Sequence, residues 1–275
     1  MPHAYVTVTL IKGTGALNVD GTVYDTRLRQ VAEAVTQAID RYTDRTFQPF
    51  DGTRFYSGDG GTLLLIDDLA VVGTLAEDNR NDGTFGTDWA AADFLTLPFN
   101  ADPTSEWGRP ITRFQVSPKS NGTQDAFLRG TRNYRLIGTF GFVSITTTVT
   151  GSASGSQGTG VTFTVDSTGT IEPGMTILVD TERMYVLSTS GTALTVQRGV
   201  QNSVVGTHAS GTAINYYDYP SPIKEAAFMQ AARLWQRRNS GFATTVGLPE
   251  LGMITTFRGL DDDVKHMLNP YRRLH

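Results

Sequence analysis

The sequence contains no cysteine among its 275 residues. This absence excludes disulfides, thiolate metal sites and cysteine nucleophiles, and it favours assembly in a reducing cytoplasm. Histidine is scarce as well: only four are present, and no two of them have the helical His-x-x-x-His spacing of a zinc site. We therefore predict that the protein holds no metal and no cofactor.

A basic surface and long apolar runs are also lacking. The formal net charge of −4 argues against broad adhesion to nucleic acid, which needs many cations to displace the counterions of the phosphates. DNA passing along the protein is compatible with this charge. No apolar run approaches the length that spans a bilayer, and residues 1–10 lack the basic region of a secretory signal. We expect neither membrane insertion nor secretion.

Glycine is abundant, with 29 residues, and many threonines and serines accompany it. This composition is typical of numerous turns between short strands. Alternating apolar and polar residues predict a first strand at residues 5–10. A meander should follow over 53–78, with separate strands at 62–66 and 69–75, and further strands at 111–116 and 133–140. A chain of this length buries about 75% of its unfolded surface, so its core can stabilise it without cross-links.

Three segments have the apolar periodicity of helices. The first should begin near Tyr24 or Asp25. The second is capped by Ser221, and Pro222 suits its first turn, where a missing N–H needs no partner. A short third helix should follow a cap at 261–263, and we expect the first two helices to pack together. The apolar positions are Leu28, Val31, Val35, Ile39 and Tyr42; Ile223, Ala227, Ala231, Leu234 and Trp235; and Val264, Met267 and Leu268.

Residues 79–109 are rich in Asp, Gly, Asn and Pro, which predicts a long loop or a pair of hairpins. Loops of this length are usually functional. We interpret the aromatic residues of this loop as a contact between subunits. These residues are Phe85, Trp89, Phe94 and Trp107.

Residues 144–216 differ in composition from the rest of the chain. Residues 151–160 consist of Gly, Ser, Thr, Ala and Gln, which is typical of a flexible linker. Four or five strand candidates follow between Val161 and Ile214. We therefore predict an inserted small all-β domain over 144–216.

The C-terminal block has a distinctive succession of motifs. These are Pro-x-Pro-Ile-Lys-Glu-Ala at 220–226, Ala-Ala-Arg-Leu-Trp-Gln-Arg-Arg at 231–238, Gly-Leu-Asp-Asp-Asp-Val at 259–264 and Asn-Pro-Tyr-Arg-Arg at 269–273. Together with upstream segments at 31–47, 53–56 and 63–69, they resemble the head–tail connector (adaptor) proteins of tailed bacteriophages. The inserted segment, with Asp180-x-Glu182 and later Arg198-Gly199 and His208-Ala209, resembles small β-modules of phage structural proteins.

The resemblance implies an α+β fold. A helical connector core, made of a long N-terminal helix and the C-terminal helices with a β-meander, would comprise residues 1–143 and 217–275, and the inserted domain would comprise 144–216. It also implies a structural protein of the virion neck, assembled in the host cytoplasm. That protein would form a ring, twelve-fold in the family, between the portal protein and the stopper or tail protein. The ring would extend the DNA channel and catalyse no reaction. From the place of the insertion in the chain, we expect the inserted domain to have a peripheral role, such as contacting the capsid or neighbouring subunits.

Two basic segments are candidate contact sites. The C-terminal residues have no evident internal role, and a chain end normally frays unless a partner holds it, so we expect them to bind the portal. They are Tyr271, Arg272, Arg273, Leu274 and His275. Three arginines of the second helix either face the channel or a partner, or simply lie near a helix C-terminus with solvated heads. They are Arg233, Arg237 and Arg238.

Catalytic motifs find no support in the sequence. The glycines at 155–160 lack the flanking strand and helix of a phosphate-binding loop, and no Gly-x-Ser-x-Gly elbow is present. Asp67-Asp68 and Asp180 with Glu182 have the composition of a glycosidase pair, but strand-end turns explain them more simply. Asp261 to Asp263 lack the ligand spacing of a calcium loop.

Two other functions stay open. The first is a phage-associated carbohydrate-binding protein or glycan hydrolase, with the inserted domain as its working part. Aromatic-lined clefts would favour it, whereas threonine-rich strands do not. The second is another minor head or baseplate component, which composition does not separate from a connector.

Overall fold

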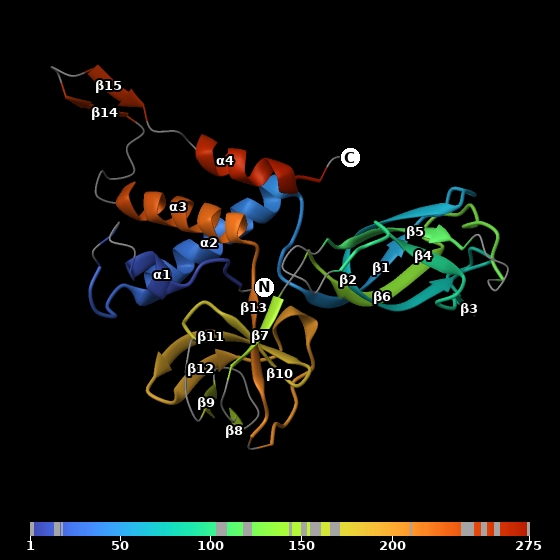
Figure 1. The fold of residues 1–275 in the computed structure, drawn as a ribbon, viewed down its shortest axis with the longest axis horizontal. Coiled ribbons are helices and arrows are strands. Elements are labelled where there is room, and N and C mark those ends of the chain that lie inside the picture. Colours follow the sequence, from blue (N-terminus) through green and yellow to red (C-terminus); the bar gives the residue numbers. More distant parts are fainter. Residues whose placement is uncertain are drawn as a thin grey trace. The chain divides into compact units, whose positions relative to one another are not determined.

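The computed structural model divides the chain into two compact units. The helix-bearing unit comprises Met1–Arg45, Thr146–Val200 and Val204–His275, and the six-stranded unit comprises Thr46–Ile145 and Gln201–Ser203 (Figure 1). The structure describes residues 3–13, 17, 19–102, 109–117, 123–142, 145–149, 153–154, 161–165, 171–209, 211–237, 245–248, 252–255 and 259–273.

The predicted fold class is wrong. The chain is mostly β, with most of its strands in two antiparallel sheets, and it has no helical core built on a long N-terminal helix. The physical reason lies in where the large side chains are buried. Tyr134, Phe114, Phe127 and Phe140, which are among the largest fully buried side chains, lie in the six-stranded unit. The helices therefore cover apolar surface but do not form the main core.

The six-stranded unit contains a single antiparallel sheet. Its order is β1-β6-β2-β5-β4, with β3 paired to β2. The predicted strands at 62–66 and 69–75 are one strand, in which the pairing register shifts between Leu65 and Leu69. The strands are β1 (Phe50–Tyr56), β2 (Leu63–Glu77), β3 (Thr87–Asp88), β4 (Phe94–Leu97), β5 (Ile111–Val116) and β6 (Tyr134–Phe140).

Glycine allows β2 and β6 to approach each other closely. A Cβ atom on Gly73 would lie 2.4 Å from the carbonyl oxygen of Ile137, and one on Gly138 would lie 2.5 Å from that of Val71. Real Cβ atoms do not come this near to backbone oxygen, so neither position accepts a side chain without a shift of the strands. The two glycines thus permit the bulged pairing of β2 with β6.

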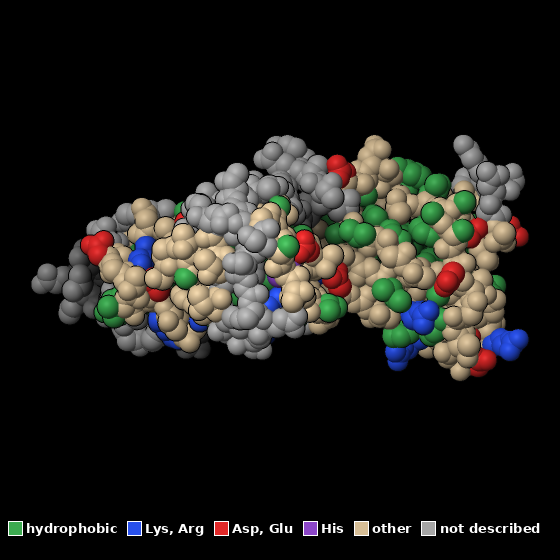
Figure 2. Space-filling view, turned by 90° about the horizontal axis from the view of Figure 1, so that it is seen from below, with side chains coloured by type: hydrophobic (Ala, Val, Ile, Leu, Met, Phe, Trp, Pro, Cys, Tyr) green, Lys and Arg blue, Asp and Glu red, His purple; other side chains and the backbone are tan. Residues whose placement is uncertain are grey.

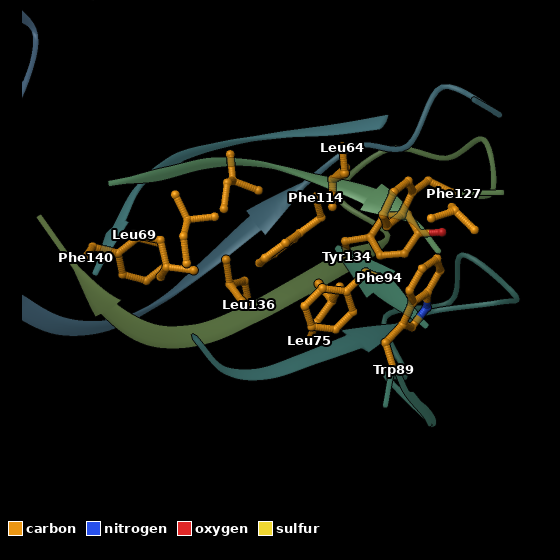
Figure 3. Packing of buried hydrophobic residues seen from close by; sticks show 13 residues of the cluster. Leu64, Leu69, Leu75, Trp89, Phe94, Phe114, Phe127, Tyr134, Leu136 and Phe140 are labelled. Carbon is orange, nitrogen blue, oxygen red and sulfur yellow. The ribbon is translucent and has the colours of Figure 1, made fainter. Parts of the chain in front are cut away.

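The core of this unit fills one face of the sheet (Figure 3). Trp89 stacks on Phe127 with ring centroids 4.5 Å apart, and Tyr134 meets Phe127 edge to face at 5.4 Å. At the other end of the cluster, Leu69 and Phe140 lie together (Figure 3). Alternation along the strands puts these residues on one face, so residues of loops and strands close the same core.

The helix-bearing unit gathers its four helices in one layer (Figure 1). The first predicted helix begins at Asp25, as expected, and Asp261 caps the last helix by accepting the Asp262 N–H at 2.8 Å. Ile223, Ala227 and Ala231, from the predicted stripe, are fully buried. The helices are α1 (Val8–Gly13), α2 (Asp25–Thr43), α3 (Ser221–Arg237) and α4 (Asp262–Leu268), which continues into a 3-10 turn, η3 (Asn269–Tyr271).

The predicted strand at residues 5–10 is wrong, because α1 begins there. Tyr5, Val8 and Ile11 are all buried, which is a spacing of three and suits one helical face. The Thr7 hydroxyl accepts the Leu10 N–H at 3.2 Å and so caps the first turn. A short segment rich in β-branched residues is compatible with both the period of a strand and the period of a helix. Here packing against the rest of the unit favours the helix.

A seven-stranded antiparallel sheet lies in the same unit, in the order β7-β13-β10-β11-β12-β9-β8. Its core contains Ile177, Met184, Val186, Leu194 and Val196, all fully buried. The strands of this sheet are β7 (Ile145–Val149), β8 (Ala153–Ser154), β9 (Val161–Val165), β10 (Thr176–Val179), β11 (Glu182–Ser190), β12 (Ala193–Gln197) and β13 (Ile214–Asp218). A separate hairpin is formed by β14 (Thr245–Leu248) and β15 (Gly252–Thr255). A 3-10 turn, η1, covers Val200–Asn202.

The helices and the seven-stranded sheet make direct contacts. The fully buried Tyr185 of β11 donates its hydroxyl to Glu33 of α2 at 2.9 Å. Burial raises the pKa of Tyr185, and the charge of Glu33 raises it further, so this phenol stays a donor. The Val8 N–H of α1 also donates to the carbonyl oxygen of Pro173 at 3.4 Å. The proposed division of the chain at 144 and 216 stays a prediction, and these contacts define how to test it.

We expect Tyr185→Phe to lower the free energy of unfolding by about 1 kcal/mol, because it removes one buried hydrogen bond. Replacing residues 144–216 by a short Gly-Ser link should lower the unfolding temperature further, because the faces of α1 and α2 lose their cover. Thermal unfolding followed by circular dichroism measures both. Tyr216→Phe is the matched control, because the Tyr216 hydroxyl forms no hydrogen bond with the described residues. A shortened protein with the wild-type unfolding temperature would show that 144–216 is a separable domain.

Candidate functional site

The predicted aromatic loop is largely part of the core. Trp89 and Phe94 are buried, and the Trp89 indole N–H donates to the buried carboxylate of Glu77 at 2.8 Å. Neither side chain is available to another subunit. Phe85 is half-buried and packs on Phe55 with ring centroids 5.5 Å apart. Trp107 lies outside the described residues. Of the four predicted contact residues, only Phe85 is placed at the surface.

The three arginines of the second predicted helix are not seen together on one exposed face of that helix. Arg233 pairs with Asp261, the cap residue of α4, so it joins α3 to α4. Gln230 strengthens the same junction, because its side chain accepts the Asp261 N–H at 3.0 Å and donates to the Gly259 carbonyl at 3.2 Å. Arg237 is half-buried in the last turn of α3. Arg238 lies outside the described residues.

The C-terminal segment, residues 269–273, is docked on the end of α2. The Tyr42 hydroxyl donates to the Asn269 side-chain oxygen at 2.7 Å, and the Arg272 guanidinium lies 5.2 Å from the centre of the Tyr42 ring. The Arg273 N–H donates to the carbonyl oxygen of Thr43 at 2.9 Å. This bond satisfies one of the carbonyls that a helix end leaves without a partner.

These contacts give the basic tail an internal role that the sequence did not reveal. Arg272 stacks on a ring of α2, and its charge lies near the negative end of the helix dipole. Leu274 and His275 lie outside the described residues. The segment thus presents a fixed backbone up to Arg273, from which the last two residues continue.

The seven-stranded sheet and its connections, which we call the β-module, contain a buried charge network that the sequence did not predict. Glu182, at the start of β11, accepts hydrogen bonds from the Arg198 Nε at 2.9 Å and Nη2 at 2.5 Å. It also accepts the N–H groups of Gly199 at 3.1 Å and Gly206 at 3.0 Å. The side chains of Glu182 and Arg198 are each 1% exposed. The carboxylate therefore holds both ends of the 199–206 loop.

His208 extends this network to the surface. Its Nε2 lies 2.9 Å from Glu182, and its Nδ1 lies 2.7 Å from Asp180, whose left-handed backbone forms the turn between β10 and β11. A ring with both protons donates to both carboxylates, whereas a neutral ring donates to only one. Burial alone would raise the pKa of Glu182, but the hydrogen bonds from Arg198, Gly206 and His208 outweigh it and lower that pKa.

The lowered pKa of Glu182 makes the β-module sensitive to acid. The stabilisation is complete above the pKa of an unfolded glutamate, about 4.5, and is lost as the pH falls through the lower folded value. Glu182→Gln should destabilise the protein by about 3–5 kcal/mol, because Arg198 stays buried without its counter-charge. Urea unfolding at pH 7 and pH 3 measures both effects. Asp59→Asn, at an exposed carboxylate, is the control; an equal loss in both variants would contradict the assignment.

A shallow hollow of about 570 Å³ lies on the surface of the six-stranded unit. Val71, Ile137 and Thr53 line it, together with Asp51, which accepts the Thr139 hydroxyl at 2.7 Å. No aromatic residue is among its lining residues, and Asp51 is its single carboxylate. A glycosidase needs two carboxylates across a cleft, and sugar sites usually offer an aromatic ring. The hollow does not fit the glycan alternative.

Asp67 and Asp68, explained above as residues of a strand-end turn, do not act as a carboxylate pair. Asp67 pairs with Arg54 and accepts the Tyr56 hydroxyl at 3.1 Å, while the neighbouring Asp68 is buried. Adjacent residues of a strand point to opposite faces. Within the described part of the chain, no group of His, Asp and Glu has the arrangement of a metal site. Among the same residues, no helix has the length and apolar character needed to cross a membrane.

Comparisons of the chain with protein-family models, with curated proteins and with solved structures gave no match. The interpretation of the protein therefore depends on its residues and their geometry.

Proposed function

We propose that this protein is a structural component of a tailed-phage virion, a head–tail connector that joins the portal protein to the stopper or tail protein. The supporting observation is the place of the helical segments among those that carry the sequence resemblance; the other two, 53–56 and 63–69, lie in the six-stranded sheet. Residues 31–45, 220–237 and 259–273, which lie far apart in the chain, belong to the single layer formed by α2, α3, α4 and η3. Motifs that converge on one layer are expected of a shared contact surface.

The proposed mechanism is geometric. Copies of the chain form a ring, a dodecamer in the family that the sequence resembles, and extend the channel through which DNA passes. Such a ring is held by heterologous contacts, in which one surface of each copy meets a different surface of the next. Several large apolar side chains are exposed and available for such contacts (Figure 2). They include Leu65, Phe99 and Val204, which are 71%, 69% and 80% exposed.

In this proposal the C-terminal segment binds the portal and the β-module contacts the capsid or a neighbouring subunit. Neither role needs a cofactor, a metal or a catalytic residue. The surface that lines the channel only has to let DNA pass and need not bind it, so the net charge of −4 is compatible with this role.

Electron microscopy of purified particles tests the proposed location. Labelled protein should appear only at the vertex that carries the portal, with a copy number equal to the symmetry of a closed ring. Native mass spectrometry of the isolated protein is not decisive, since ring closure can require the portal. Labelling scattered over the capsid, or confined to the distal end of the tail, would contradict the connector function.

A chain that ends at Pro270 tests the proposed portal contact. It should keep its helical circular dichroism signal but lose about 1–2 kcal/mol of stability, because the Arg273 hydrogen bond and the stack of Arg272 on Tyr42 disappear. Co-sedimentation with the portal protein should be lost.

Tyr42→Phe is the matched control for this truncation. It removes the hydrogen bond to Asn269 and keeps residues 271–275, so it should lower stability and preserve portal binding. Full portal binding by the truncated chain would assign the portal contact to another surface.

A further inference from the structure

Four side chains of the six-stranded unit form a continuous row of cation–π and ring contacts, which we call the arginine–phenylalanine ladder. The Arg132 guanidinium lies 4.9 Å from the centre of the Phe55 ring, and the Phe55 and Phe85 rings are 5.5 Å apart. The Arg135 guanidinium lies 5.0 Å from the centre of the Phe85 ring. Phe55 and Arg135 come from paired positions of β1 and β6, so the sheet fixes one inner member and one end of the ladder.

The two arginines of the ladder carry charge that nothing in the described structure neutralises. Among the described residues, neither the Arg132 nor the Arg135 guanidinium forms an ion pair or donates a hydrogen bond. The Nε atom of Arg135 is buried and has no hydrogen-bond partner. Stacking on a ring uses the face of a guanidinium and leaves the N–H donors at its edge available. The ladder therefore presents an exposed and a half-buried guanidinium, neither of which forms a hydrogen bond or ion pair within the described structure.

The ladder lies beside an open sheet edge. Among the described strands, β1 is the end strand of the sheet and pairs with β6 alone. The Asn202 side chain donates to the Asp51 carbonyl oxygen at 3.0 Å, which covers one end of this edge. Residues two apart in a strand direct their backbone groups to the same side, so Thr53 and Phe55 face the same open edge as Asp51. Phe55 is also 39% exposed.

We propose that the arginine–phenylalanine ladder and the edge of β1 bind an extended, carboxylate-bearing segment of a partner protein. Charge complementarity selects this occupant, because a guanidinium edge matches a carboxylate with two parallel hydrogen bonds. The Cζ atoms of Arg132 and Arg135 are linked through the two ring centres by spacings of 4.9, 5.5 and 5.0 Å, so their separation cannot exceed the sum of the three. An extended segment rises ~3.3 Å per residue, so about four or five residues reach both arginines.

Nucleic acid fits this surface less well. Single-stranded nucleic acid stacks its bases on free aromatic faces, but in the ladder Phe55 lies between Arg132 and Phe85, and Phe85 is covered by Arg135. The net charge of −4 also opposes broad phosphate binding. Edge-strand pairing adds main-chain hydrogen bonds to the side-chain contacts, which is a common way to recognise an extended peptide. This proposal is independent of the connector function.

The test uses a fluorescently labelled octapeptide of alternating Glu and Thr, with a Gln-Thr peptide as the uncharged control. Fluorescence anisotropy at low salt should show that the full-length protein binds the Glu peptide and not the Gln peptide. The double variant R132Q/R135Q should raise the dissociation constant at least tenfold. Phe55→Ala, which keeps both charges but removes the platform of Arg132, should raise it at least threefold.

The matched control is R109Q/R113Q, which removes the same charge at and before β5, two strands from β6. Its dissociation constant should stay within twofold of wild type, and all variants should have the wild-type circular dichroism spectrum. If both double variants weakened binding of the Glu peptide equally, the binding would depend on the overall charge of the protein and not on the ladder. That result would overturn the proposal. Tighter binding of a DNA oligonucleotide than of the Glu peptide, or no binding of the Glu peptide, would overturn it as well.

Discussion

An antiparallel sheet with one apolar face must cover that face, and most of this structure follows from that requirement. The six-stranded sheet covers its own face, because Trp89 and Phe127 come from outside the long strands and stack against Tyr134. The glycine pair at Gly73 and Gly138 allows the bulge that brings β2 and β6 together. The helices meet a second need, which is to bury their own apolar stripes against one another and, through Tyr185 and Glu33, to join the other sheet.

Local features of the sequence predicted the helices well and the fold class badly. The starts of α2, α3 and α4 follow from periodicity and caps within a few residues: Asp261 caps α4 as predicted, whereas Ser221 lies inside α3, whose first turn donates to the carbonyl oxygen of Pro220. Sheet pairing depends on contacts between distant residues. β7 pairs with β13 across more than sixty residues of chain, and no local pattern encodes that choice. The amphipathic helices have the clearest pattern in the sequence, whereas the largest buried side chains are mostly in the strands and their connections.

The candidate sites were predictable only where one segment carries the whole feature. The basic character of residues 271–273 is visible in the sequence, but their partners Tyr42 and Thr43 are more than two hundred residues away. Asp180, Glu182, Arg198 and His208 stood out as residue types, yet their convergence depends on the registers of β10, β11 and β12. The arginine–phenylalanine ladder left a weaker signal, since nothing local connects Phe55 and Phe85 to Arg135 of β6 and to Arg132 just before it.

The buried Glu182–Arg198 pair is better explained by what it positions than by what it adds to stability. Replacing a buried ion pair by apolar residues is often neutral or stabilising, so stability alone does not account for it. An apolar residue at position 182 would leave the N–H groups of Gly199 and Gly206 without their acceptor. The carboxylate thus fixes a loop that a hydrophobic core cannot fix.

This loop has an unusual apolar tip. Between the two anchored glycines lie Val204 and Val205, which are 80% and 42% exposed. The loop buries Val200, Gln201 and Ser203, whereas ordering Val204 and Val205 in water costs backbone entropy and buries neither valine completely. The rigid backbone around them lowers the entropy that a later contact must overcome. A loop fixed by a buried charge and tipped with valine is therefore suited to assembly, in which the contact surface is ordered before the partner arrives.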